Sequence, residues 1–253
     1  MELTDQQLTR YARHIILREI GGDGQKRLLG ASVALVGAGG IGSPAIQYLA
    51  GAGIGQLIVI DDDRVELSNL QRQTLFGIDT VGTAKAEAAR QAVARLNPDV
   101  TVTPRVARID ATNAADLLAG ADVVIDGSDN FATRLAVADA ALAARIPLVS
   151  AAVGAFEGQL AVFRGWEGDK PCYRCFVGDD PGRADASCAD QGVIGALTGV
   201  VGSLAALEAI RAIVPFGEDS AGKLLLIDAL ALRMRTITLP PDPACPACGA
   251  GYG

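Results

Sequence analysis

Residues 32–42 read SVALVGAGGIG, and this short stretch decides the fold. Its first half, Ser32 to Val36, is a compact apolar run that predicts a buried strand. The glycine-rich second half, followed by a helix expected over 43–53, allows a tight turn and a close approach of the backbone to phosphate. The helix start adds free N–H groups and a dipole that favours negative charge. Candidate nucleotide-binding residues of this loop are Gly37, Gly39, Gly40 and Gly42.

A second buried strand is expected over 57–61, and it ends in Asp61, 19 residues after Gly42. A carboxylate at this place can accept hydrogen bonds from both hydroxyls of a ribose, which completes the dinucleotide-binding pattern. The first hypothesis is therefore an oxidoreductase that uses NAD or FAD. A glycine-rich turn without any ligand is the alternative.

Further strands and helices alternate along the chain. Apolar strands separated by helices are typical of a parallel sheet that is covered on both faces. We therefore predict an α/β fold with a Rossmann-like doubly wound sheet. The expected helices are 83–97, 113–119 and 131–144, and the expected strands are 100–105, 122–126 and 147–152.

The C-terminal part follows a different pattern, because its apolar runs lack regular crossover helices between them. We expect strands there that extend the sheet in a partly antiparallel way, at 159–164, 223–228 and 234–239. A polar loop rich in Gly and Asp is expected to be mobile over 178–189. The whole chain, 1–253, is predicted to form one domain, with a helical arm (1–30), a nucleotide-binding half (31–155) and the sheet extension (156–253).

Composition narrows the classes of function. The net charge of the 253-residue chain is −7, which argues against a nucleic-acid binder, since that needs a basic face. A single histidine, His14, excludes a His-based triad or a His-rich metal site. The first ten residues are polar, so we expect no signal peptide and a cytoplasmic protein. An uncharged run of 17 residues between Asp190 and Glu208 is short for a membrane span and predicts a glycine-faced, tightly packed helix.

Polar side chains are dense after the second strand. Residues 61–73 read DDDRVELSNLQRQ, Lys85 follows near the start of a helix, and a later strand leads into DGSDN at 126–130. Arg72 can grip a phosphate as a fork, Lys85 can act as a point charge, and Asp129 can hold Mg²⁺. Hydride transfer needs none of these groups, so the set favours a triphosphate–metal site. Either cation taken alone would be interpreted as a solvated surface charge.

These motifs together resemble one known family, the MoeB/ThiF adenylyltransferases, which are bacterial relatives of ubiquitin-activating enzymes. The resemblance covers essentially the whole chain. It implies ATP-dependent adenylylation of the C-terminal Gly carboxylate of a small ubiquitin-like sulfur carrier that ends in Gly-Gly, with release of pyrophosphate. The motifs that carry it are RYARHIIL (10–17), GAGGIG (37–42), DDDRVELSNLQRQ (61–73), VGTAKAE (81–87) and DGSDN (126–130).

The resemblance also implies roles for individual residues. The amides around Gly40 would approach the phosphates, Asp61 would hold the ribose, and Asp129 would coordinate Mg²⁺. Arg13 matches a family arginine that reaches the triphosphate from the other subunit, which implies a homodimer. The catalytic set would then be Arg13, Arg72, Lys85 and Asp129. Further expected contacts of ATP are Asp63, Ser68, Asn69, Gln73 and Asn130.

Four of the five cysteines form two C-x-x-C pairs, which are far apart in the sequence. Two such pairs supply the four thiolates of a tetrahedral Zn²⁺ site, and a site closed by four cysteines leaves no position for substrate. We therefore predict a structural zinc ion that ties the C-terminal tail to the sheet extension. Two disulfides or a redox C-x-x-C are the alternatives, the first disfavoured by a cytoplasmic location. The expected ligands are Cys172, Cys175, Cys245 and Cys248.

Cys188 is the fifth cysteine and lies near the end of the polar loop. It matches the family's loop cysteine, which has been considered as a nucleophile in sulfur or acyl transfer. A thiol without an essential role is the alternative. The chain ends five residues after Cys248, so no rhodanese-like domain is expected and sulfur would come from another protein.

Three hypotheses of different classes follow. The first is the adenylyltransferase, the second an NAD-dependent oxidoreductase, and the third a catalytically silent scaffold that binds a ubiquitin-like partner. The intact cation set, with Asp129, weighs against the scaffold. Within the family, the similarity through RYARHIILREIG (10–21) and SNLQRQTLF (68–76) favours the molybdopterin-synthase small subunit as substrate over the thiamine sulfur carrier.

Overall fold

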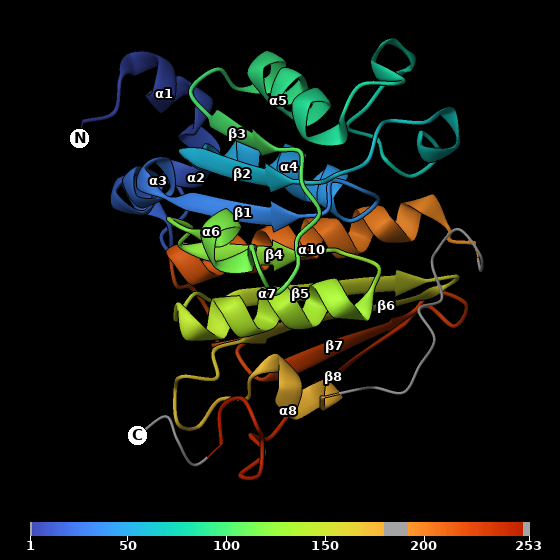
Figure 1. Cartoon of the computed structure of the whole chain (residues 1–253). Coiled ribbons are helices and arrows are strands. Elements are labelled where there is room, and N and C mark those ends of the chain that lie inside the picture. Colours follow the sequence, from blue (N-terminus) through green and yellow to red (C-terminus); the bar gives the residue numbers. More distant parts are fainter. Residues whose placement is uncertain (1, 180–191, 250–253) are drawn as a thin grey trace.

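One eight-stranded sheet forms the centre of the protein, in the order β3-β2-β1-β4-β5-β6-β7-β8 (Figure 1). The computed structural model describes residues 2–179 and 192–249. Strands β1 to β5 run parallel, and β6 to β8 continue the sheet in antiparallel fashion. The strands are β1 Ser32–Val36, β2 Gln56–Ile60, β3 Thr101–Arg105, β4 Val123–Asp126, β5 Leu148–Gly154, β6 Glu157–Phe163, β7 Lys223–Asp228 and β8 Arg233–Thr238.

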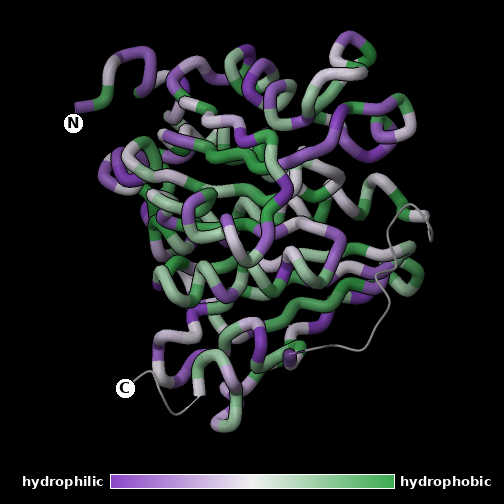
Figure 2. Tube along the Cα trace, in the orientation of Figure 1, coloured by the Kyte–Doolittle hydropathy of each residue, from purple (hydrophilic) through white to green (hydrophobic). Residues whose placement is uncertain are grey.

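Helices cover both faces of the parallel part. One apolar core lies between the sheet and the helices α3, α4, α5 and α10, and a second lies between the sheet and α6, α7 and α8. Figure 2 shows hydrophobic residues concentrated along the central strands. The helices are α1 Asp5–Arg10, α2 Ala12–Ile15, α3 Gly21–Gly30, α4 Gly42–Ala52, α5 Lys85–Leu96, α6 Ala114–Leu118, α7 Phe131–Ala143, α8 Tyr173–Val177 and α10 Gly195–Ile213.

Strand β1 shows why this sequence forms a two-sided sheet. All five of its residues are buried. Side chains alternate along a strand, so Val33 and Leu35 enter one core while Ala34 and Val36 enter the other. A strand whose residues are all apolar from Val33 to Val36 can therefore be satisfied only by packing on both faces. The predicted α/β fold with a doubly wound sheet and an antiparallel extension is confirmed.

The sequence missed only short elements. It predicted the long helices and all eight strands close to their observed bounds. It did not predict α8, nor the two 3₁₀ turns η1 Leu67–Asn69 and η2 Ile78–Thr80. Most of the expected mobile loop, 180–189, lies outside the described residues, and so does Cys188.

Helix α10 includes residues 195–207 of the 17-residue uncharged run and is 19 residues long. Among the described residues it is the one helix long and apolar enough to cross a membrane, by length and composition only. In the fold it packs against α4, β5 and β6. Its close contacts depend on glycine: a Cβ on Gly202 would lie 2.2 Å from the carbonyl oxygen of Ile41, and one on Gly195 would lie 2.4 Å from that of Gln71. The expected glycine-mediated packing is thus observed within the chain.

We predict that Gly202→Ala lowers the free energy of unfolding by about 1–3 kcal/mol, because the added methyl group overpacks a backbone contact. Gly199 on the same helix is the matched control, since a Cβ there would meet nothing within 4 Å. Gly199→Ala is expected to stabilise the helix by about 0.5–1 kcal/mol. Urea and thermal unfolding of both variants would check this. Equal stability of the two would contradict the contact between α10 and the glycine loop.

Candidate active site

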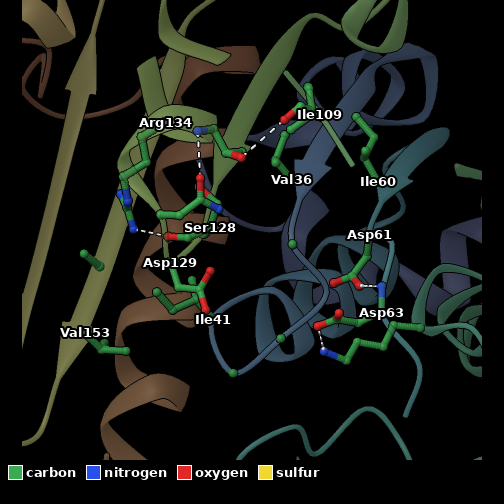
Figure 3. A pocket seen from close by; sticks show the side chains of 18 of the residues that line it. Val36, Ile41, Ile60, Asp61, Asp63, Ile109, Ser128, Asp129, Arg134 and Val153 are labelled. Carbon is green, nitrogen blue, oxygen red and sulfur yellow. Dashed lines mark hydrogen bonds and ion pairs between the residues drawn. The ribbon is translucent and has the colours of Figure 1, made fainter. Parts of the chain in front are cut away.

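A cavity of about 840 Å³ opens at the carboxyl ends of the parallel strands. It lies where β1 separates β2 from β4, the place at which doubly wound sheets bind ligands. Figure 3 shows Asp61 and Asp63 on one side of the pocket and Ser128, Asp129 and Arg134 on the other. The predicted residues that line it are Gly37, Gly39, Gly40, Asp61, Asp63, Asn69, Arg72, Gln73, Lys85, Asp129 and Asn130.

The glycine loop is shaped by one left-handed backbone conformation and one close backbone contact. Gly37 has a φ of +88°, a conformation that side chains rarely adopt. A Cβ on Gly42 would lie 2.0 Å from the carbonyl oxygen of Gly37, so this glycine closes the loop and does not line the cavity. Gly39 and Gly40 do line it. The loop therefore leaves room for a ligand directly against the backbone.

Asp61 is held in place by the loop it faces. Its two carboxylate oxygens accept hydrogen bonds from the backbone N–H groups of Ala38 (2.7 Å) and Asp63 (2.9 Å). Burial raises the pKa of Asp61 above its ordinary value, and the charge of Lys85 opposes this rise. The carboxylate is thus fixed and partly desolvated, in a position suited to accept hydrogen bonds from ligand hydroxyls.

The two predicted cations lie at the cavity in different settings. The side chain of Lys85 is only 7% exposed, and its Nζ lies 2.8 Å from the carboxylate of Asp63. Arg72 is half-buried, and its guanidinium donates to the carbonyl oxygen of Ser68 at 3.3 Å. Both line the same pocket as the glycine loop. A polyanion bound there would meet two positive charges beside free backbone amides.

The remaining predicted residues differ in whether they line the cavity. Ser68 is exposed and donates to Glu66, and it does not line the cavity. Arg13 is exposed on α2 and is likewise absent from the cavity wall of this chain. Asn130 lines the cavity and also caps α7, accepting from the N–H of Thr133 at 2.9 Å. The side chain of Asp129 is exposed at the cavity.

Arg134 on α7 and Tyr173 on α8 are among the polar residues of the cavity wall that sequence reasoning missed. Both are buried. A signal existed for Arg134, because it precedes Val137, Ala138 and Ala141 by three, four and seven positions, on one buried face of the helix. Nothing in the spacing around Tyr173 pointed to the cavity.

The four predicted metal ligands meet in one cluster. Their sulfur atoms all lie within 4.8 Å of one another, although the two pairs are distant in sequence. Adjacent sulfurs are 3.4–3.8 Å apart, and all four cysteines are free. Zn–S bonds of about 2.3 Å in a tetrahedron require sulfurs about 3.8 Å apart. The cluster therefore fits a four-thiolate zinc ion, and the disulfide alternative is not observed.

Comparison with known families identifies the chain. The ThiF family matches residues 11–247. The chain belongs to this family. A SAMP-activating enzyme E1 of Haloferax volcanii is 48% identical over 99% of this chain and 92% of its own length. A molybdopterin-synthase adenylyltransferase of Salmonella typhimurium is 44% identical over 98% of this chain and 99% of its own length.

Solved structures agree with this assignment. The crystal structure of Escherichia coli MccB with ATP matches this chain with a TM-score of 0.82 and 26% sequence identity. The match covers 95% of this chain and 74% of the MccB chain. The resemblance drawn from the motifs is therefore confirmed at the level of the ThiF family. The two relatives named above match nearly the whole of this chain and nearly the whole of their own length.

We predict a pH-dependent stability difference between the wild type and Asp61→Asn. A raised folded-state pKa means that Asp61 favours folding when protonated, and this contribution is lost as pH rises through that pKa. The difference in melting temperature, variant minus wild type, should therefore increase with pH. The increase is expected between the ordinary pKa of an aspartic acid and neutral pH. Other groups titrate in both proteins, so their effects cancel. A difference that is constant with pH would contradict the buried position of this carboxyl.

Proposed function

We propose that this protein adenylylates the C-terminal carboxylate of a small ubiquitin-like sulfur carrier, using ATP. The observation that carries the proposal is one cavity in which a glycine loop, a ribose-accepting carboxylate and two cations converge. ThiF-family relatives along nearly the whole chain are named as an adenylyltransferase and a SAMP-activating enzyme. The molybdopterin-synthase small subunit is the substrate that we favour, and the thiamine sulfur carrier is the alternative.

The reaction is an in-line displacement at the α-phosphorus of ATP. A carboxylate oxygen of the carrier's terminal glycine forms a bond to that phosphorus, and the bond to the oxygen that bridges the α- and β-phosphates breaks. The electron pair leaves with pyrophosphate. No proton has to be moved, so the protein's task is to position the groups and neutralise charge. This suits a chain with a single histidine.

Several of the predicted cavity residues have a place in this scheme. Asp61 accepts from the ribose, the amides near Gly40 face the phosphates, and Arg72 and Lys85 stabilise the charge that moves onto pyrophosphate. Asn69 and Gln73 add polar contacts, and Gln73 Oε1 is a buried acceptor without a partner among the described residues. Asp129 would hold Mg²⁺, which neutralises phosphate charge when bound.

The exposure of Arg13 supports a second part of the proposal, a homodimer. An exposed arginine on α2 that does not reach the cavity of its own chain is free to reach the cavity of a partner chain.

A separate protein would supply sulfur after the acyl-adenylate has formed. Cys188, which lies outside the described residues, is not needed for adenylylation in this scheme. We place the reaction in the cytoplasm.

We predict that pyrophosphate exchange into ATP depends on a carrier that ends in Gly-Gly. Arg72→Ala, Lys85→Ala and Asp129→Ala should each lower this exchange by about 10²–10³-fold, as the loss of a charge-stabilising group does. Arg90→Ala is the matched control, because Arg90 is exposed on α5, where it pairs with Glu87. Near-normal exchange by Asp129→Ala would overturn the Mg²⁺ assignment.

Two ligands separate this proposal from the oxidoreductase hypothesis. MgATP, and not NADH, should raise the melting temperature, since only a ligand of the native state stabilises it. A carrier that lacks its last glycine serves as the control for the exchange assay. Stabilisation by NADH alone would overturn the proposal, and comparing molybdopterin and thiamine carriers decides between the two pathways.

We further propose that the four-cysteine cluster holds a structural zinc ion. Metal analysis of the purified protein should give one zinc per chain. Cys175→Ser and Cys248→Ser should lose the ion and much stability, because a structural zinc site contributes directly to folding. Cys188→Ser is the control from outside the cluster and should keep both zinc and pyrophosphate exchange. A stable, metal-free native protein would contradict the assignment.

A further inference from the structure

The short loop between β4 and α7, residues 127–130, carries Asp129 at the cavity and is held at Ser128. The backbone N–H and the hydroxyl of Ser128 donate to Oδ1 of Asp126 at 2.9 and 2.7 Å. The carbonyl oxygen of Ser128 accepts from the guanidinium of Arg134 (Figure 3). Each of the three polar groups of Ser128 thus has a partner. The backbone that leads into Asp129 is therefore fixed.

The residues that hold Ser128 lie where the apolar core under α7 ends. Val124 and Leu148 are register partners on β4 and β5, and both belong to this core. Two residues further along each strand, Asp126 and Ser150 are also register partners, so they lie on the same face of the sheet. Arg134 is the fourth residue of α7, and its guanidinium donates to Oγ of Ser150 at 3.4 Å. Polar side chains therefore replace apolar ones on this face as the strands reach the cavity.

Arg134 joins the loop to strand β5. Its side chain is buried, with the residue 7% exposed, and besides Ser128 it donates to the carbonyl oxygen of Ala151 at 2.9 Å. A buried charge is tolerated only when it is hydrogen-bonded, so these bonds are costly to lose. A guanidinium is planar and rigid. Acceptors from the loop and from β5 that share one guanidinium are therefore kept at a fixed separation.

We propose that Arg134 and Asp126 are positioning residues that hold Asp129 ready to receive the metal ion of a bound nucleotide. The inference rests on the proposed function, in which Asp129 holds Mg²⁺. Neither residue needs to contact ATP, because both act through the backbone of Ser128. A loop released at Ser128 would still carry the carboxylate, but ordering that carboxylate when MgATP binds would cost conformational entropy.

The test is Arg134→Gln in the full-length protein, with the Kd for ATP measured by calorimetry in the presence and absence of Mg²⁺. With Mg²⁺ the Kd is expected to rise about tenfold, the effect of losing hydrogen bonds from a charged group. Without Mg²⁺, ATP relies on the glycine loop, Arg72 and Lys85 and not on Asp129, so the variant should bind it as the wild type does. The Mg²⁺-free buffer contains no chelator, so that the proposed zinc ion stays bound.

Arg211→Gln is the matched control. Arg211 also donates from a helix to a backbone carbonyl oxygen, that of Phe216, but it does not line the cavity. Losing an arginine of this kind should leave both Kd values as they are in the wild type.

Ser128→Ala examines the other side of the same loop and changes the fold less. It removes only the hydroxyl bond to Asp126, while the backbone bonds to Asp126 and Arg134 stay. The Kd for MgATP is expected to rise about threefold, as for the loss of one ordinary hydrogen bond. This variant keeps the proposal testable if Arg134→Gln does not fold.

A second readout is a double-mutant cycle with Asp129→Ala. If Arg134 acts through Asp129, then Arg134→Gln should have no further effect on the Kd for MgATP once residue 129 is alanine. An arginine that contacts the phosphates, or that only supports the fold, would give two effects that multiply. The cycle decides the question also where metal-free ATP binds too weakly to measure.

The outcomes separate the two proposals. A wild type that does not bind MgATP overturns the proposed function itself. A wild type that binds MgATP, with Arg134→Gln and Ser128→Ala binding it equally well, overturns only the positioning role. Equal weakening with and without Mg²⁺ also overturns that role, because the arginine would then act on the phosphates or on the fold. Weaker binding confined to MgATP, with no further effect beside Asp129→Ala, supports it.

Discussion

The close packing of backbone around the glycine loop is the constraint on which the rest of the structure depends. Gly42 must lie against the carbonyl oxygen of Gly37, and Gly202 of α10 against that of Ile41. Any side chain at these positions would separate the loop from the helices that support it. Because α10 also packs on β5 and β6, it joins the nucleotide loop to the antiparallel part of the sheet. The shape of the glycine loop and the position of the antiparallel strands therefore depend on each other through α10.

Charge in the cavity is a local arrangement, and net charge says little about it. The chain carries −7 overall, yet Arg72, Lys85 and Arg134 line one pocket. Screening in salt limits the effect of distant surface carboxylates to about 8–10 Å, whereas groups inside the cavity act on a ligand at contact distance. An acidic protein can thus bind a polyanion. Pairing Lys85 with Asp63 keeps that cation stable in a desolvated position before any ligand is present.

The sequence alone was sufficient to predict those parts of the fold that depend on the order of apolar residues and glycines along the chain. Strand β1 is apolar from Val33 to Val36 and is followed by glycines, so its burial and the loop could be predicted from eleven residues. The spacing on α7 indicates a buried face for Arg134, but its partners could not be predicted, since they are backbone acceptors from β5 and from the loop after β4 that meet it only in space. Helix α8 was missed for a related reason: five residues show no periodicity, and tertiary contacts alone hold them.

The cysteine cluster compensates for a weakness in the sheet extension. The parallel half has a core on each face, whereas all six residues of β8 are exposed. The cluster of buried residues beside the C-terminal tail contains only Leu142, Cys172 and Cys245. So few buried side chains contribute little hydrophobic stabilisation, but a four-thiolate zinc site supplies about 10 kcal/mol or more of binding free energy. The proposed zinc ion would therefore fix the C-terminal tail, and the order of α8 would then depend on metal supply.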